Sequence, residues 1–218
     1  LLSSIETELF YLAEFSDTVV DIREQFPIIP LNFTQKVART IGVKHPTHPK
    51  TKEPIVVTTD FLLTHQSGDS VKYQAISVKA EGETNNLRSM EKIDIERVCW
   101  QLLGVQFKLY TGSQLTRVES ENISWASSPF RENASCFSDT QIDLALHGLS
   151  VGQHFVSDIC NRFIALDIVS HELALTLLRF LIVEKYMEVD LTSSIAETGF
   201  VIIKNIHSNS EIILYGNR

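Results

Sequence analysis

Two strand-like runs joined by a short polar turn constrain the fold of this 218-residue chain more than any other feature. The first run is Thr58-Thr59-Asp60-Phe61-Leu62-Leu63, and the second is Gln74-Ala75-Ile76-Ser77-Val78-Lys79. Between them lies His65-Gln66-Ser67-Gly68-Asp69, whose glycine is typical of a hairpin turn. Because side chains alternate along a strand, Ser77 and Lys79 are expected on one face of the sheet and Val78 on the other.

This hairpin carries the residue types of a metal-dependent nuclease. Asp60 on the first strand could reach the side of the sheet that carries Lys79. Carboxylates are hard oxygen ligands for Mg²⁺, and a lysine can orient water or stabilise charge on phosphate. Taken alone the pattern is weak, because such aspartates are more often turn formers and such lysines are more often solvated charges.

Several blocks around the hairpin make the pattern specific. In chain order they are Leu1-Leu2-Ser3-Ser4-Ile5-Glu6, Asp21-Ile22-Arg23-Glu24-Gln25-Phe26-Pro27, Gly42-Val43-Lys44-His45-Pro46, Thr59-Asp60-Phe61-Leu62, Val78-Lys79, Glu91-Lys92, Glu96-Arg97 and Trp100. Together they closely resemble the TnsA family, the endonuclease subunits of heteromeric TnsA/TnsB bacterial cut-and-paste transposases. The resemblance covers most of residues 1 to about 126, and the block that begins at Asp21 is highly specific.

The resemblance implies roles for individual residues. The family's helix-borne catalytic glutamate falls on Glu6, its metal-binding aspartate on Asp60 and its catalytic lysine on Lys79. The backbone carbonyl of Val78 would be a further metal ligand. Related sites carry glutamate or glutamine where this chain has Ser77, and the shorter, uncharged serine would ligate a metal through water or not at all. The implied cofactor is Mg²⁺, which Mn²⁺ is expected to replace.

Glu6 has a second interpretation. A helix is predicted from Ser4 to Phe15, because apolar residues recur there at helical spacing. Ser3 and Glu6 fit a capping box, in which the glutamate bonds back to the backbone at the helix start. The residues alone favour the cap, whereas the resemblance favours the catalytic role.

The rest of the first domain reads as strand, loop, helix and strand. A strand from Thr18 to Phe26 is expected to end at Pro27, and a helix is predicted from Ser89 to Leu103. The solvent-exposed face of that helix is expected to carry Glu91, Asp94, Glu96 and Arg97. A strand from Val105 to Thr111 is expected to follow. This order fits an α/β domain with a mixed sheet, and the resemblance implies a restriction-endonuclease-like fold.

Residues 32–54 are predicted to form a polar, proline-containing surface loop. Its two histidines, His45 and His48, do not make a metal site because a third ligand is missing nearby. Lys44 and His45 are better candidates for contacts to a DNA backbone, since the loop leads directly into the strand of Asp60.

The predicted organisation is a catalytic domain at 1–126, a linker at 127–138 and a winged-helix-like domain at 139–218. The last of these rests on expected helices at 139–146, 153–168 and 170–186 and on strands at 187–191 and 200–206. The helix after Ser170 would read a DNA groove in such a domain. Its few cations favour contact with protein over contact with DNA.

The net charge of −8 and the absence of a Lys/Arg run argue against a stand-alone nuclease, which must hold DNA unaided. We therefore expect either a partner that delivers the DNA or a basic segment that precedes Leu1. No apolar run reaches the roughly 20 residues of a membrane span. Three widely spaced cysteines fit neither a disulfide framework nor a zinc site, so the bacterial cytoplasm is the expected compartment.

The sequence therefore predicts a Mg²⁺-dependent endonuclease subunit that cuts the 5′ strands at transposon ends. Its expected partners are transposon-end DNA, a TnsB-like transposase and a TnsC-like ATPase regulator, with no membrane. The alternative is a catalytically weak or inactive assembly subunit that bridges the two protein partners. Ser77 and the acidic composition motivate this alternative.

Overall fold

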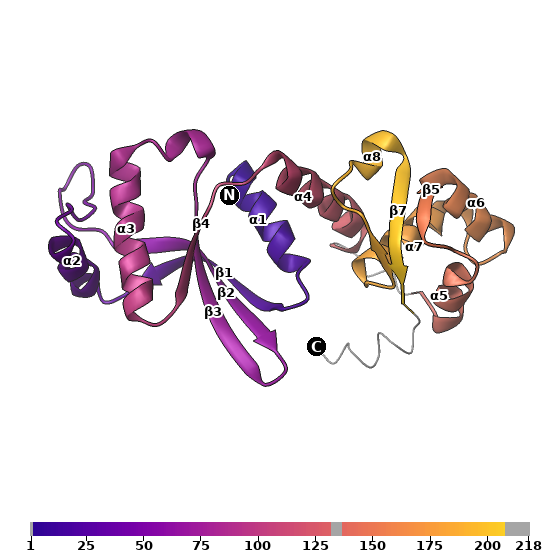
Figure 1. The fold of residues 1–218 in the computed structure, drawn as a ribbon, viewed down its shortest axis with the longest axis horizontal. Helices are drawn as coiled ribbons and strands as arrows, with labels where there is room; N and C mark the ends of the chain where they lie inside the picture. The colour runs from indigo at the N-terminus through magenta and orange to yellow at the C-terminus, as the bar shows by residue number, and fades with distance from the viewer. Residues whose placement is uncertain (1, 132–136, 208–218) are drawn as a thin grey trace. The chain divides into compact units, whose positions relative to one another are not determined.

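A computed structural model describes residues 2–131 and 137–207 of the chain. The chain divides into two compact units, Leu1–Ser113 and Gln114–Arg218. Both units combine helices with a small sheet (Figure 1). The predicted α/β class is therefore confirmed.

The first unit is built on a four-stranded mixed sheet in the order β1-β2-β3-β4. Strands β1, β2 and β3 pair antiparallel, whereas β3 and β4 pair parallel. The elements of this unit are α1 (Ser4–Glu14), β1 (Val19–Ile28), α2 (Leu31–Thr40), β2 (Val57–Ser67), β3 (Ser70–Val78), the 3-10 turn η1 (Glu81–Glu83), α3 (Leu87–Leu102) and β4 (Gln106–Tyr110).

Apolar side chains from the two faces of this sheet form separate cores. On one face, Leu9 of α1 packs with Phe61 and Val78. On the other face, Leu62 of β2 packs with α2 and with Trp100 of α3. The alternation of side chains along β2 explains why neighbours such as Phe61 and Leu62 enter different cores. Helices therefore cover both faces of the hairpin.

The predicted hairpin is confirmed, and its strands are longer than expected. The β2–β3 register runs from Phe61 opposite Ile76 to Ser67 opposite Ser70. Gly68 in the turn has a φ of 56°, a conformation that glycine adopts without steric cost. Strand β1 continues through Pro27, which the sequence analysis took as its end. Proline is tolerated there because β1 lies at the edge of the sheet.

The prediction of a loop throughout 32–54 was wrong, because helix α2 occupies Leu31–Thr40. Its buried residues Thr34, Val37 and Ala38 recur at helical spacing and face the α3 side of the sheet. Pro30 stands at the N-cap, where its fixed φ is compatible with a helix start. The helical period was present in the sequence, but the surrounding polar residues and prolines obscured it.

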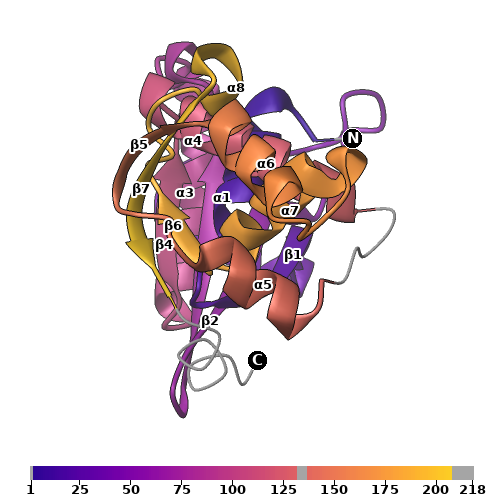
Figure 2. The same ribbon diagram turned by 90° about the vertical axis from the view of Figure 1, so that its right-hand side faces the viewer.

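The second unit carries an antiparallel three-stranded sheet in the order β5-β7-β6 (Figure 2). Its elements are α4 (Gln114–Ser127), the 3-10 turn η2 (Ser128–Phe130), α5 (Asp139–Leu146), β5 (Gly152–Phe155), α6 (Val156–Ala165), α7 (His171–Val183), β6 (Met187–Val189), α8 (Ile195–Thr198) and β7 (Phe200–Ile206). The helix expected at 153–168 begins only at Val156, because Gly152–Phe155 pairs with β7 instead.

Helix α4 explains why the units divide at Ser113 and not near residue 126. The side chain of Asn122 on α4 donates to the carbonyls of Leu191 and Ser193, each at 2.8 Å, and accepts from the amide of Ile195 at 3.0 Å. These bonds anchor α4 within the second unit. A linker was predicted at 127–138. Its first residues are helical instead, because α4 ends at Ser127 and η2 follows at once. Residues 132–136 lie outside the described residues.

Among the described residues, no helix has both the length and the apolar character that a membrane crossing requires.

Truncating Phe61 tests the packing of the hairpin between its two helical layers. Phe61 is fully buried, so Phe61→Ala is expected to lower the free energy of unfolding of the first unit by roughly 3 to 5 kcal/mol. The exposed Val71→Thr, on the same hairpin, should change it by less than about 0.5 kcal/mol. Urea unfolding followed by circular dichroism measures both changes, and equal effects would contradict the assignment of Phe61 to the core.

Candidate active site

The two hairpin strands separate at Asp60, and this fork creates the candidate site. The β2–β3 pairing ends where Phe61 faces Ile76. Beyond that point, the amide of Val78 donates to Oδ2 of Asp60 at 2.7 Å. Strand β3 instead continues beside β4, and the amide of Lys79 donates to the carbonyl of Tyr110 at 2.9 Å. The Asp60 carboxylate thus replaces the backbone partner that Val78 loses at the fork.

Gln25 fixes the other oxygen of Asp60. It lies on β1 between Glu24 and Phe26, which pair with Phe61 and Thr59 of β2, and its Nε2 donates to Oδ1 of Asp60 at 3.0 Å. Its own Oε1 accepts a hydrogen bond from Thr58 at 3.1 Å. The backbone of Gln25 has a φ of 47°, which is uncommon for a residue with a side chain. Part of the specific block that begins at Asp21 thus positions the aspartate, a role that the sequence analysis missed.

Glu96 of α3 is the main residue that the sequence analysis misassigned. It was expected on the solvent-exposed face of its helix, yet it is only 8% exposed. Its Oε2 accepts hydrogen bonds from the hydroxyls of Ser77 on β3 and of Thr59 on β2, the latter at 3.2 Å. Thr59 in turn accepts from the indole nitrogen of Trp100 at 2.7 Å. A carboxylate from the helix is therefore held between the two separating strands.

The environment of Glu96 is unfavourable for its charge. The pKa of Glu96 is raised from 4.5 to about 7, chiefly by burial and in smaller part by the negative charge of Asp60. The hydrogen bonds from Ser77 and Thr59 and the positive charge of Lys79 oppose this rise in pKa. Asp60, Lys79 and Glu96 are thus close enough to interact electrostatically. Perturbed carboxylates of this kind are frequent at functional sites.

Ser77 has a different role from the metal ligation that was considered from the sequence. It is buried, and its hydroxyl donates a hydrogen bond to Oε2 of Glu96. Val78 packs with α1 on the opposite face, as the strand alternation predicted. Glu96 follows Ile93 by three residues and precedes Trp100 by four, both of which are buried. This helical spacing was the signal that placed Glu96 on the inner face.

Glu6 forms the capping box that the residues alone favoured. The amide of Ser3 donates to Oε2 of Glu6 at 2.6 Å, and the amide of Glu6 donates to Oγ of Ser3 at 3.4 Å. Within the described residues, no hydrogen bond or ion pair joins Glu6 to Asp60 or Lys79. Ile5 next to it packs in the same core as Val78, so the first turn of α1 covers the Val78 face of the sheet.

A second carboxylate on α1 is more deeply buried. Glu8 accepts a hydrogen bond from the hydroxyl of Tyr110, the last residue of β4. Gly112 lies so close that an added Cβ would be 3.1 Å from Oε1 of Glu8. Tyr110 also pairs with Val78 across the β3–β4 register. The sequence analysis did not single out Glu8.

Lys44 and His45 lie in the segment between α2 and β2. Lys44 is exposed, and its carbonyl accepts from Arg88 of α3 at 2.7 Å. Both ring nitrogens of His45 have partners within the protein, Thr34 at 2.9 Å and the carbonyl of Pro46 at 3.0 Å. His45 therefore holds the segment to α2, and the DNA contacts expected of Lys44 and His45 stay predictions.

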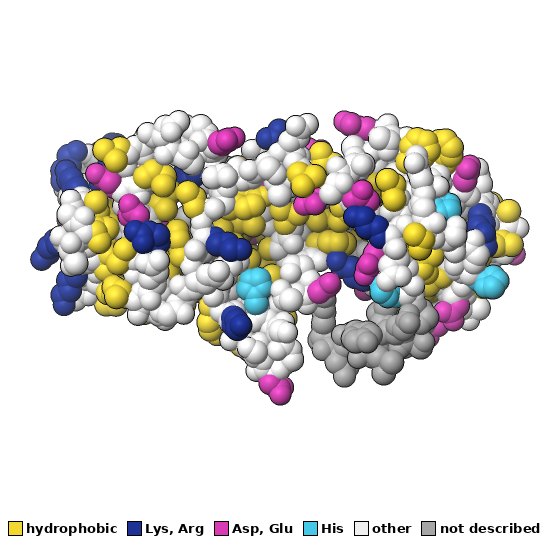
Figure 3. All heavy atoms as spheres, viewed as in Figure 1, with side chains coloured by type: hydrophobic (Ala, Val, Ile, Leu, Met, Phe, Trp, Pro, Cys, Tyr) yellow, Lys and Arg dark blue, Asp and Glu magenta, His cyan; other side chains and the backbone are white. Residues whose placement is uncertain are grey.

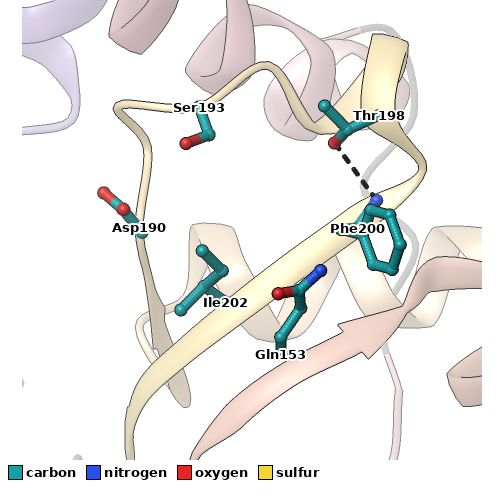
Figure 4. A pocket seen from close by; sticks show the side chains of 6 residues that line it. All are labelled: Gln153, Asp190, Ser193, Thr198, Phe200 and Ile202. Atoms are coloured by element: carbon teal, nitrogen blue, oxygen red, sulfur yellow. Dashed lines mark hydrogen bonds between the residues drawn. The ribbon is translucent and has the colours of Figure 1, made fainter.

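No group of three or more His, Cys, Asp and Glu side chains within 2–131 and 137–207 is arranged to hold a metal ion. The second unit has a pocket of about 140 Å³, shown in Figure 4, that contains none of the predicted site residues. Its residues are Gln153, Asp190, Ser193, Thr198, Phe200 and Ile202. The carboxylate of Asp190 is already engaged by Lys204 at 3.0 Å.

Comparison with known proteins identifies the family of the first unit. A family model described as TnsA-like endonuclease N terminal matches residues 16–112. Residues 16–112 belong to the TnsA-like endonuclease family. The Tn7 transposition protein TnsA of Escherichia coli is 32% identical over 163 residues, which make up 74% of this chain and 58% of that relative.

The TnsA-like match includes the residues at the fork. Gln25, Asp60, Lys79 and Glu96 all lie within 16–112, whereas Glu6 and Glu8 lie outside it. The first unit ends at Ser113, so a similarity of 163 residues to Tn7 TnsA extends into the second unit. This is farther than the resemblance that the sequence motifs reveal. The chain nevertheless spans little more than half the length of that relative.

Glu96→Gln tests the cost of the buried carboxylate. The pKa of Glu96 is about 7 in the folded protein and 4.5 in the unfolded chain. Protonated Glu96 therefore stabilises the fold fully below pH 4.5, and this stabilisation is lost as the pH rises through 7. At pH 8.5 in EDTA, Glu96→Gln is expected to be more stable than the wild type by roughly 3 kcal/mol, or less where the fold relaxes.

The matched control is Asp94→Asn, which changes a half-exposed carboxylate on the same helix. Relative to this control, the gain of Glu96→Gln should disappear at pH 4.5. Thermal unfolding at the two pH values measures the difference. A gain that is the same at both pH values would contradict the assignment.

Proposed function

We propose that the chain is a Mg²⁺-dependent endonuclease subunit that cuts the 5′ strands at transposon ends during cut-and-paste transposition. The observation that carries this proposal is the convergence of Asp60, Lys79 and Glu96 at the fork between β2 and β3. The TnsA-like domain supports the endonuclease class, and the name of the Tn7 relative supports a role in transposition.

The donor set suits a hard divalent cation. Asp60 and Glu96 offer carboxylate oxygens, and the carbonyl of Val78 would be a third oxygen ligand, all of the type that Mg²⁺ prefers. Burial and the charge of Asp60 raise the pKa of Glu96, and a bound cation would remove this penalty. Mn²⁺ has similar ligand preferences and is expected to replace Mg²⁺.

When bound, the cation lowers the pKa of the attacking water and neutralises charge on the phosphate. Gln25 and the amide of Val78 keep the Asp60 carboxylate in one orientation. Lys79 follows β3 and would orient the water or stabilise charge that develops on the phosphate. Glu6 remains a candidate for an assembled complex, in which its carboxylate would leave the helix cap.

The fork also bears on the alternative of an inactive assembly subunit. That alternative rests on Ser77 at a position where related sites carry a metal ligand. In this chain Ser77 donates to Glu96, so a carboxylate from α3 occupies the region that the serine leaves open. This arrangement supports the endonuclease proposal over the inactive alternative.

We further propose that the first unit is restriction-endonuclease-like and that the second is winged-helix-like. The mixed sheet with helices on both faces supports the former. The helices and the three-stranded antiparallel sheet support the latter. The proposed partners are transposon-end DNA, a TnsB-like transposase and a TnsC-like ATPase. The second unit is the candidate for the protein contacts.

Strand-specific cleavage of a labelled transposon-end duplex tests the proposed function. The reaction contains this chain, its TnsB-like and TnsC-like partners, and Mg²⁺. Asp60→Asn keeps an oxygen acceptor for Val78 but removes the charge, and it should lower 5′-strand cleavage by at least about 100-fold. Unchanged 5′ cleavage by a folded Asp60→Asn protein would refute the assignment. Assembly without any 5′ nick in the wild type would favour the scaffold alternative.

The contribution of Glu96 is measured by Glu96→Gln against Asp94→Asn in the same assay. Loss of one carboxylate that holds the cation is expected to lower 5′ cleavage by about 100-fold, with partial recovery when Mn²⁺ replaces Mg²⁺. Asp94 is paired with Arg97 on the outer side of α3, so its substitution should have less than about a twofold effect. Similar activity of the two variants would exclude Glu96 from the site.

A further inference from the structure

The first unit has a basic face that the net charge of −8 conceals. Five exposed cations lie on α2 and on the segment that follows it: Lys36, Arg39, Lys44, Lys50 and Lys52. Between Pro27 and Thr59 the sequence contains a single acid, Glu53. Figure 3 shows Lys and Arg side chains gathered over the end of the unit that α2 and this segment form. Of these five cations the sequence motifs indicated Lys44 alone, because the five do not form a run in the sequence.

The segment that carries the basic face is ordered by its own hydrogen bonds. The amide of His48 donates to the carbonyl of Glu53 at 2.8 Å, and the amide of Ile55 donates to that of Pro46 at 3.1 Å. A hydrogen bond of 2.9 Å between His45 and Thr34 holds the segment to α2. The cations are thus presented on a fixed surface, which reduces the entropy lost on binding.

The basic face is also connected to the helix that carries Glu96. Arg88 near the start of α3 donates to the carbonyl of Lys44 at 2.7 Å and forms an ion pair with Glu91 at 2.7 Å. Apolar residues of α2 and α3 pack in one core on the same side of the sheet. A ligand bound to the basic face would therefore be held in a fixed position relative to the candidate active site.

We propose that the basic face binds the phosphate backbone of duplex DNA beside the cleavage point. This inference rests on the proposed function, because it names where that substrate is held. Exposed lysines and arginines release counterions when they contact phosphates, without reading the base sequence. Within 31–54 no large apolar side chain is highly exposed, and the exposed Ile29, Ile55 and Val56 only flank these residues in sequence. A protein interface would instead present apolar or aromatic residues at its centre.

The test measures binding of the full-length chain to a fluorescein-labelled 30-bp duplex of arbitrary sequence, by anisotropy at increasing salt. Lys36→Glu/Lys50→Glu reverses one charge on α2 and one on the following segment. It should weaken binding at about 50 mM salt at least tenfold and reduce the slope of log affinity against log salt by about two. Melting curves confirm that each variant is folded.

The matched control is Lys72→Glu/Lys108→Glu, which makes the same change in net charge at exposed positions on β3 and β4. It should bind like the wild type. Absence of wild-type binding at about 50 mM salt, unchanged binding by Lys36→Glu/Lys50→Glu, or an equal loss in the control would each overturn the inference. If Lys36→Glu/Lys50→Glu lowers cleavage in the complex but not duplex binding, the basic face would instead bind an acidic partner protein.

Asp60→Asn separates this inference from the proposed function. It should bind the duplex as tightly as the wild type, because Asp60 lies outside the basic face. Suppose that only Lys36→Glu/Lys50→Glu weakens duplex binding but no complex, wild type included, cuts the 5′ strand: the DNA-binding role of the basic face is then supported and the endonuclease proposal is refuted. Suppose instead that cleavage depends on Asp60 but Lys36→Glu/Lys50→Glu binds the duplex like the wild type: the endonuclease proposal is then supported and the DNA-binding role of the basic face is refuted.

Discussion

The hydrogen bond from the amide of Val78 to Asp60 is the interaction on which the candidate site depends. It gives the amide of Val78 a partner where β3 separates from β2, while β3 keeps its pairing with β4 on the other edge. It also fixes the aspartate at the point where the strands separate. Gln25 completes this arrangement from β1, at the cost of an uncommon backbone conformation.

The fork brings a second carboxylate into an environment that disfavours charge. Two hydroxyl donors, Ser77 and Thr59, stabilise Glu96, yet burial and the charge of Asp60 still raise its pKa to about 7. A fold optimised only for stability would not keep this arrangement, because an apolar residue costs less at a buried position. This unfavourable environment is one basis for the proposal that a cation binds there. Thr59 also links the site to the core through Trp100.

The hairpin, the cap at Ser3 and most helices could be predicted because each depends on local periodicity and turn chemistry. Asp60 and Lys79 could be singled out because the first lies on a hairpin strand and the second directly follows one. The inner position of Glu96 required knowledge of which helical face meets the sheet, and a charged residue argued for the outer one. Apart from Lys44, the cations of the basic face were missed for a related reason, since they are separated in sequence and are brought together only by the packing of α2 against its neighbours.

The central claim is that Asp60 and Glu96 share one divalent cation. Mn²⁺ binding to the full-length chain, followed by the loss of the free-ion signal in electron paramagnetic resonance, tests it without partners or DNA. The account predicts binding by the wild type and by Asp94→Asn, and at least about tenfold weaker binding by Glu96→Gln and by Asp60→Asn. Equal Mn²⁺ affinity of Glu96→Gln and the wild type would contradict it.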